Sequence, residues 1–163
     1  VAITRSGTDK GQLTDHDVIV LDLDVPISGP VSAETPLHLA RYRADDAIGA
    51  VLHVHSISAT VLSRLEAPRG ELRMNGFEME KAIDGITSHE TQLVVPIFEN
   101  SQDMPRLAAV IESRLGAQPS VPAYLLAGHG LYAWGHDMNE ARRHVEGLEF
   151  LLDCALEERR IGR

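Results

Sequence analysis

The sequence contains a single cysteine, Cys154, among its 163 residues. One cysteine excludes an intrachain disulfide and a zinc site built from several thiolates. This usage fits a reducing compartment, so we expect a cytoplasmic protein. Cys154 itself lies in an apolar helical pattern and is expected to be a core residue rather than a nucleophile.

Basic residues are also scarce, with Lys+Arg 15 against Asp+Glu 24 and a formal net charge of −9. Nucleic acids and anionic membranes bind proteins through basic patches, so this balance argues against both partners. A small anionic substrate needs only a local site and remains compatible with the charge.

Long apolar runs are missing as well, since no segment approaches the roughly 18 residues that cross a bilayer. No signal peptide, internal repeat or linker is visible. Hydrophobic content of 44% and charged content of 24% are ordinary for a soluble globular protein. We therefore expect residues 1–163 to form a single domain.

Strand-like and helix-like patterns alternate along the chain. The predicted strands span 1–4, 18–23, 50–55, 93–97, 123–127 and 131–134. The predicted helices span 32–43, 57–65, 76–83 and 104–115, with a last one that begins at Asp137. Ser32 is the expected N-cap of the first helix, and Pro96 suggests an edge or an end of its strand. These elements predict an α/β sandwich around a mainly antiparallel sheet.

His53 and His55 close an apolar run as His-Val-His. Side chains two positions apart on a strand share one face, so both imidazoles could reach one metal ion. The alternative is a strand end with one histidine facing water. A zinc site would need further ligands, and three protein ligands with an open position form the catalytic arrangement.

His129 is the best candidate for a third ligand among the six other histidines. It stands between Gly128 and Gly130 at the end of an apolar run. Glycines allow a sharp turn or a close approach of the backbone to a ligand. Alone, His129 would be an ordinary turn residue, but with His53 and His55 it makes a three-histidine site plausible.

Acid–base chemistry beside a metal needs a carboxylate, and four glutamates are candidates. They are Glu34, Glu78, Glu80 and Glu90. Glu78 is flanked by apolar residues, which could bury it and raise its pKa. The alternative is a solvated helix residue.

Two short segments suggest an anion site. Ser6 and Gly7 follow a strand in a loop that carries Lys10, and Ser32 opens a predicted helix. Free N–H groups at a helix N-terminus attract phosphate. Each segment is weak by itself, and Ser32 could simply be a cap.

The motifs resemble the class II aldolase/adducin family in their order along nearly the whole chain. The order is Thr4-Arg5-Ser6-Gly7, Ser32-Ala33-Glu34, His53-Val54-His55-Ser56 and Gly128-His129-Gly130. Residues 55–64, 76–83 and 95–103 look specifically like the branch of this family that dehydrates a ketose 1-phosphate, and 130–144 agree. The resemblance implies a class II aldolase-like three-layer sandwich, with a central sheet covered by helices.

The resemblance also implies roles for the candidate residues. It implies one Zn²⁺ per subunit held by three histidines, a catalytic acid/base, and contacts to substrate phosphate. The ligands would be His53, His55 and His129, the acid/base Glu78, and the phosphate contacts Ser6, Gly7 and Ser32. In aldolase relatives the Ser-x-Glu glutamate, here Glu34, is the acid/base, and we rank it second as a residue near substrate or metal.

The resemblance further implies a homo-oligomer, typically a tetramer with sites near subunit contacts, acting on a small phosphorylated ketose. The family's leading helix and Gly-Asn phosphate loop would precede Val1, so we expect sequence upstream of it. Iron, cobalt or manganese could replace zinc, because imidazole suits several metals. The rival functions are an aldolase or epimerase acting on another sugar phosphate, and a noncatalytic interaction module as in adducin.

Overall fold

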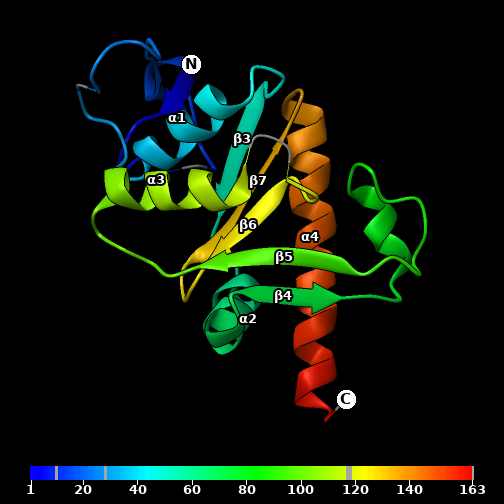
Figure 1. Ribbon diagram of the computed structural model, residues 1–163. Helices are drawn as coiled ribbons and strands as arrows, with labels where there is room; N and C mark the ends of the chain where they lie inside the picture. Colours follow the sequence, from blue (N-terminus) through cyan, green and yellow to red (C-terminus); the bar gives the residue numbers. More distant parts are fainter. Residues whose placement is uncertain (10, 28, 117–118, 163) are drawn as a thin grey trace.

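The computed structural model describes residues 1–9, 11–27, 29–116 and 119–162 (Figure 1). Its strands are β1 (Ala2–Thr4), β2 (Val18–Val20), β3 (Ala50–Val54), β4 (Glu71–Met74), β5 (Leu93–Phe98), β6 (Ala123–Leu126) and β7 (Gly130–Gly135). Its α-helices are α1 (Thr35–Ala44), α2 (Ile57–Glu66), α3 (Met104–Leu115) and α4 (Met138–Arg160). Three short 3-10 helices also occur, η1 (Asp15–Asp17), η2 (Ala67–Arg69) and η3 (Glu78–Ala82).

The main sheet has the strand order β3-β7-β6-β5-β4, and β1 pairs with β2 in a separate two-stranded sheet. The β5–β6 pair is parallel, whereas the β3–β7, β6–β7 and β4–β5 pairs are antiparallel. The sheet is therefore mixed, and the expectation of a mainly antiparallel sheet is not confirmed. The parallel pair arises because α3 connects β5 to β6 as a crossover.

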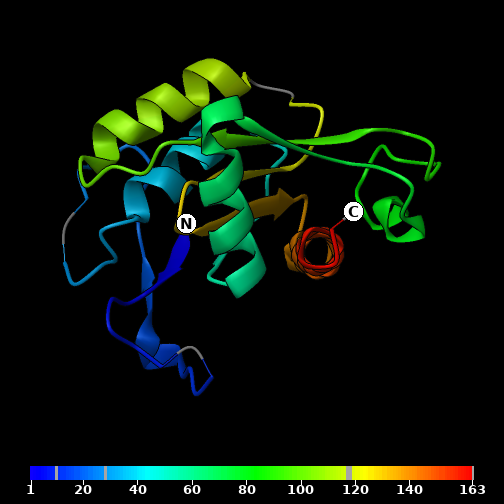
Figure 2. The same cartoon turned by 90° about the horizontal axis from the view of Figure 1, so that it is seen from below.

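Helices cover both faces of this sheet (Figure 2). Leu37 of α1 and Ile111 of α3 pack with Tyr124 and Trp134 on one face. The other face packs against α2 and α4, through residues such as Leu62, Leu148 and Leu152. Alternate residues of each strand thus serve two separate cores, which gives the three layers implied by the family resemblance.

The predicted starts of α3 and α4 are confirmed, but that of α1 is displaced. Asp103 and Asp137 cap α3 and α4, accepting backbone N–H groups from Arg106 and Glu140. In α1 the N-cap position is Glu34. Ser32 Oγ instead accepts the Glu34 N–H in a local turn before the helix.

Three features of the middle of the chain differ from the sequence-based expectations. β4 was not predicted, because its Glu-Leu-Arg-Met alternation is only four residues long. The segment 76–83 forms only the short η3 instead of a longer helix. Pro96 lies on an interior strand, although it has no N–H to donate. It is tolerated because pairing with β6 begins only at Ile97, whose own N–H donates to the Gly70 carbonyl.

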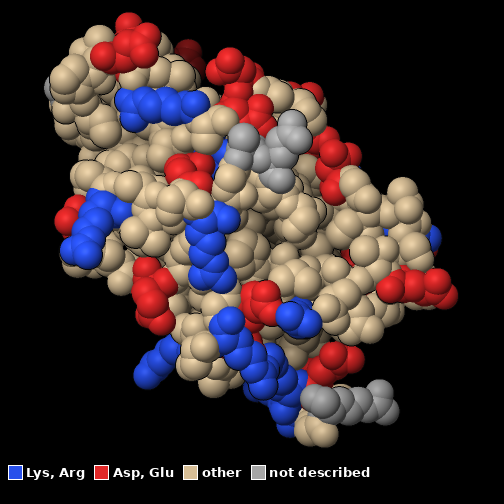
Figure 3. All heavy atoms as spheres, in the orientation of Figure 1, with Lys and Arg blue, Asp and Glu red and all other residues tan. Residues whose placement is uncertain are grey.

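Charged groups of both signs are interspersed on the face shown in Figure 3. Near the C-terminal end of α4, Arg159 pairs with Glu66 at 2.5 Å and Arg160 with Glu157 at 2.6 Å. None of the helices in the described part of the chain combines the length and apolar character needed to cross a bilayer.

Candidate metal centre

The end of β3 brings His53 and His55 together on one face of the sheet. Their Nε2 atoms are 2.8 Å apart, although His55 lies one residue beyond the strand as it is assigned. The predicted shared face is therefore confirmed. His53 is nearly buried, with 8% of its side chain exposed.

His129 reaches the same point from the turn between β6 and β7. Its Nε2 is 2.9 Å from Nε2 of His55. Gly128 adopts φ +65°, a left-handed conformation that favours glycine. A Cβ on Gly130 would lie 2.3 Å from the Val54 carbonyl oxygen and 3.0 and 3.2 Å from ring carbons of His55 and His53. The two glycines thus allow His129 to enter the cluster.

Replacing Gly130 by Ala is expected to lower the free energy of unfolding by about 1–3 kcal/mol, because the backbone of β3 must move away. Chemical denaturation of the metal-free protein measures this change. Gly11→Ala is the control, since its added Cβ would meet only an Asp9 side-chain oxygen at 3.4 Å. Equal stability of the two variants would contradict the close approach at Gly130.

Glu34 completes the group from the start of α1. Its Oε1 lies 2.9 Å from Nε2 of His129 and 3.7 Å from Nε2 of His53. One ligand atom from each of Glu34, His53, His55 and His129 lies within 4.8 Å of all the others. Glu34, which ranks below Glu78 from the sequence, thus lies beside two of the predicted metal ligands.

The donor set fits a divalent metal. The His53 Nδ1–H donates to the Leu131 carbonyl at 2.9 Å, so the neutral ring presents an unprotonated Nε2 to the cluster. Nitrogens about 2.0–2.1 Å from a tetrahedral zinc ion are about 3.3 Å apart, so the present contacts would open by only about half an ångström. The convergence of three imidazoles and a carboxylate is the observation that favours a cation.

Burial is the main cause that lowers the pKa of His53 to about 3. The hydrogen bond to Leu131 raises this pKa, whereas the neighbouring His55, His129 and His38 lower it further. An unfolded histidine titrates near pH 6.5. The neutral ring therefore contributes stability above that pH, and this contribution is lost as the pH falls from about 6.5 towards 3.

The metal-free protein should consequently lose about 2 kcal/mol between pH 7 and pH 5 through His53 alone. Denaturant unfolding at the two pH values measures the loss. In His53→Asn the amide could still donate to Leu131, but this part of the pH dependence should disappear. An unchanged pH dependence in the variant would show that His53 does not cause it.

The predicted phosphate residues lie close to one another. Arg5 forms a β-bridge with Val31, and the Ser6 N–H donates to the Pro30 carbonyl at 3.0 Å. These contacts bring the loop of Ser6 and Gly7 beside Ser32, two residues before Glu34. Lys10 lies outside the described residues. The arrangement is compatible with an anion site beside the histidines, and that role remains a prediction.

Glu78 lies apart from the cluster. Its side chain is 73% exposed and pairs with Lys81 at 2.6 Å and with His89 at 3.6 Å. In both views α4 stands between η3 and the turn joining β6 to β7 (Figures 1 and 2). Hydrogen bonding to Lys81 lowers the pKa of Glu78, so the expected burial and raised pKa are not found in a single chain.

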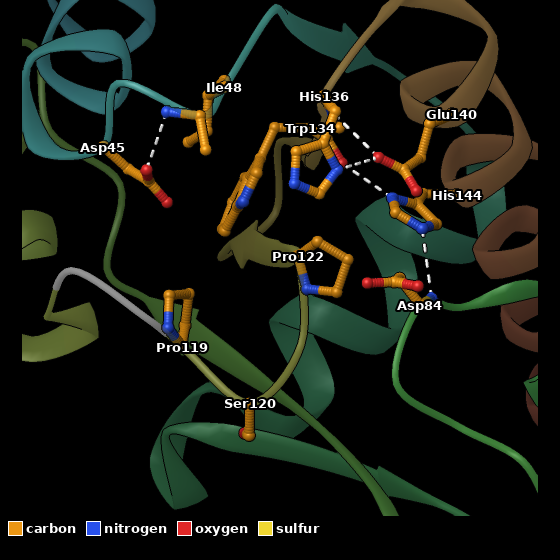
Figure 4. A pocket seen from close by; sticks show the side chains of 12 residues that line it. Asp45, Ile48, Asp84, Pro119, Ser120, Pro122, Trp134, His136, Glu140 and His144 are labelled. Carbon is orange, nitrogen blue, oxygen red and sulfur yellow. Dashed lines mark hydrogen bonds and ion pairs between the residues drawn. The ribbon is translucent and has the colours of Figure 1, made fainter.

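A hollow of about 310 Å³ lies at the end of β3 and β7 opposite the histidine cluster (Figure 4). His136 there pairs with Glu140 at 2.6 Å. The buried His144 donates from Nδ1 to the Trp134 carbonyl and accepts the Asp84 N–H at Nε2. Both nitrogens of His144 are thus engaged by backbone groups, which makes this histidine structural rather than a ligand.

Comparison with known proteins identifies the family. A sequence profile described as Class II Aldolase and Adducin N-terminal domain matches residues 1–156. A methylthioribulose-1-phosphate dehydratase of Xanthomonas campestris pv. campestris (strain 8004) is 53% identical over 159 residues, which cover 96% of this chain and 73% of the relative. A dehydratase of the same name from Sorangium cellulosum is 47% identical, covering 97% of this chain and 76% of the relative.

Solved structures agree with the profile. The crystal structure of L-fuculose-1-phosphate aldolase from Thermus thermophilus superposes with a TM-score of 0.76 at 26% identity, covering 97% of this chain and 78% of that one. The sequence motifs, the layered mixed sheet and the cluster of histidines all indicate the same family. The chain belongs to the class II aldolase and adducin family.

Proposed function

We propose that this protein is a metal-dependent hydro-lyase that dehydrates 5-methylthioribulose 1-phosphate to 2,3-diketo-5-methylthiopentyl 1-phosphate in methionine salvage. The observation that carries the proposal is the convergence of His53, His55 and His129 in a chain 53% identical to a protein named for this reaction. Family membership alone would leave the reaction open, because aldolases share the fold.

Zinc is the metal we propose, one ion per subunit. Three imidazole nitrogens with one open position form the catalytic zinc arrangement. Glu34 lies near enough to be a fourth ligand or to face the substrate. When bound, the ion supplies Lewis-acid polarisation of the ketose carbonyl, which makes the adjacent C3–H more acidic.

The protein's own residues must then move protons. A base removes the C3 proton, the C3–H electron pair forms the C3–C4 double bond, and the C4 hydroxyl leaves as water after it gains a proton. The resulting enol tautomerises to the diketone. One carboxyl group could act first as base and then as acid, provided that its pKa is raised towards neutrality.

We assign this proton transfer to Glu78 of a second copy of the chain. Within one chain α4 separates η3 from the cluster, so Glu78 could serve only a neighbouring subunit's site (Figure 1). Its 73% exposure leaves it accessible to such a neighbour, and burial there would raise its pKa. This assignment requires a homo-oligomer, and we propose a tetramer.

The loop of Ser6 and Gly7 and the turn at Ser32 would hold the substrate phosphate. They adjoin Glu34, so a phosphate bound there would orient the sugar chain towards the histidines. The N–H groups of Val31, Glu34 and Thr35 already donate within this segment, so we expect the hydroxyl groups of Ser6 and Ser32 to donate to the phosphate.

An aldolase reaction on another sugar phosphate is the second candidate, and the position of Glu34 favours it. Glu34 Oε1 lies 2.9 Å from His129 Nε2, beside the histidine cluster where the acid/base of an aldolase would act. The two reactions differ in the fate of the substrate: cleavage of a carbon–carbon bond releases an aldehyde, whereas dehydration retains every carbon. Product analysis with several ketose 1-phosphates therefore separates them, and aldehyde release would contradict the dehydratase proposal.

A further inference from the structure

Three aromatic rings lie in a row across three neighbouring strands beneath the metal centre. His53 of β3 lies directly opposite Tyr132 of β7, which in turn lies opposite Tyr124 of β6. The rings of His53 and Tyr132 stack with centroids 4.0 Å apart and planes 17° apart. Those of Tyr132 and Tyr124 stack at 4.8 Å and 12°.

Both tyrosines belong to the core, whereas His53 reaches the site. Tyr132 and Tyr124 are 0% and 1% exposed. Each ring is therefore fixed by its surroundings, and the outer face of Tyr132 forms a rigid platform for the imidazole.

His53 is held in two complementary ways by consecutive residues of β7. The Leu131 carbonyl accepts its Nδ1–H and thereby determines which nitrogen is free. The ring of Tyr132 lies parallel to the imidazole and limits rotation about its side chain. Together they direct Nε2 towards His55 and Glu34.

The other two histidines lack an equivalent support among the described residues. The ring of His55 contacts the rings of His53 and His129. Nδ1 of His129 is buried and has no hydrogen-bond partner within the described residues. His53 is thus the most rigidly oriented of the three imidazoles.

We propose that Tyr132 is a positioning residue of the metal centre, acting through its ring and not through its hydroxyl. The inference rests on the proposed function, in which the three histidines bind a divalent metal. The hydroxyl of Tyr132 is buried and makes no hydrogen bond within the described part of the chain. Removing the hydroxyl should therefore leave the orientation of His53 intact, whereas removing the ring should not.

Three variants separate the ring from the hydroxyl and from general packing. Tyr132→Phe keeps the ring. Tyr132→Met fills the space with a flexible apolar chain, and Tyr124→Met makes the same change one ring further from His53. Circular dichroism establishes whether each variant folds. If Tyr132→Met does not fold, Tyr132→Leu takes its place.

The first readout is zinc affinity, measured by competition with a chromophoric chelator. Loss of an outer-shell partner typically weakens metal binding about 10- to 100-fold. We expect that loss for Tyr132→Met, and a change of less than about 3-fold for Tyr132→Phe and Tyr124→Met. Equal weakening in the two Met variants, or unchanged affinity in Tyr132→Met, would overturn the proposal.

The second readout needs no metal. Nitrogen-15 NMR of the metal-free protein reports the tautomer of His53, and proton shifts report the ring current of Tyr132. The wild-type and Phe proteins should show one Nδ1–H tautomer with upfield-shifted ring protons, and Tyr132→Met a mixture without that shift. An unaltered tautomer in Tyr132→Met would overturn the positioning role even if the wild-type protein bound no zinc, a result that separately contradicts the proposed function.

Discussion

Replacing Glu78 by Gln should lower kcat by about 10²- to 10⁴-fold while zinc content stays at one ion per subunit. Gln is close to Glu in shape but cannot accept and return a proton. Because Glu78 lies outside the group of side chains that could hold a metal, its loss should not disturb the ion. Steady-state kinetics on the purified protein, with metal analysis of the same sample, measure both quantities.

Glu90→Gln is the matched control for this variant. Glu90 is an exposed glutamate in the same part of the chain and outside the cluster, so its replacement should leave kcat near that of the wild-type protein. Full turnover by Glu78→Gln with zinc bound would contradict the assignment and leave Glu34 as the proton carrier. Mixing Glu78→Gln with a His55→Ala variant adds a direct test, because sites shared between subunits would recover activity in mixed oligomers.

Replacing His55 by Ala should abolish stoichiometric zinc binding. Its Nε2 is the atom that lies within 2.9 Å of Nε2 of both His53 and His129, so its loss leaves only two imidazoles. Loss of a direct ligand should weaken zinc binding by more than the about 10- to 100-fold that is expected when an outer-shell partner is lost. Turnover should fall together with metal content, and a chelator-competition titration measures the affinity.

His136→Asn is the control for the loss of a histidine. His136 is 70% exposed, pairs with Glu140 at the other end of the sheet, and belongs to no group of potential metal ligands in the described residues. Its replacement should leave zinc content unchanged. Equal zinc content in His55→Ala and His136→Asn would show that the cluster is not the metal site.

The sequence predicts those parts of the site that depend on local periodicity. Alternation along β3 is enough to place His53 and His55 on one face, and the flanking glycines single out His129 once that pair is recognised. The start of α4 was likewise predictable, because Asp137 accepts a backbone N–H only three residues away.

Features that depend on packing between distant segments were not predictable in the same way. The approach of Glu34 to His129 depends on where the start of α1 meets the sheet, across about 95 residues of chain, and no short pattern encodes it. The platform of Tyr132 and the Leu131 carbonyl depends on the register of β3 against β7. The parallel β5–β6 pair likewise follows from a crossover through α3 and not from any short pattern.

Turnover of 5-methylthioribulose 1-phosphate by the full-length protein tests the central claim most directly, measured with and without a chelator and with zinc restored. We predict that the diketone phosphate forms with no loss of carbon, that the chelator stops its formation, and that zinc restores it. Unimpaired dehydration by protein shown to be free of metal, or release of an aldehyde in place of the diketone, would contradict the account.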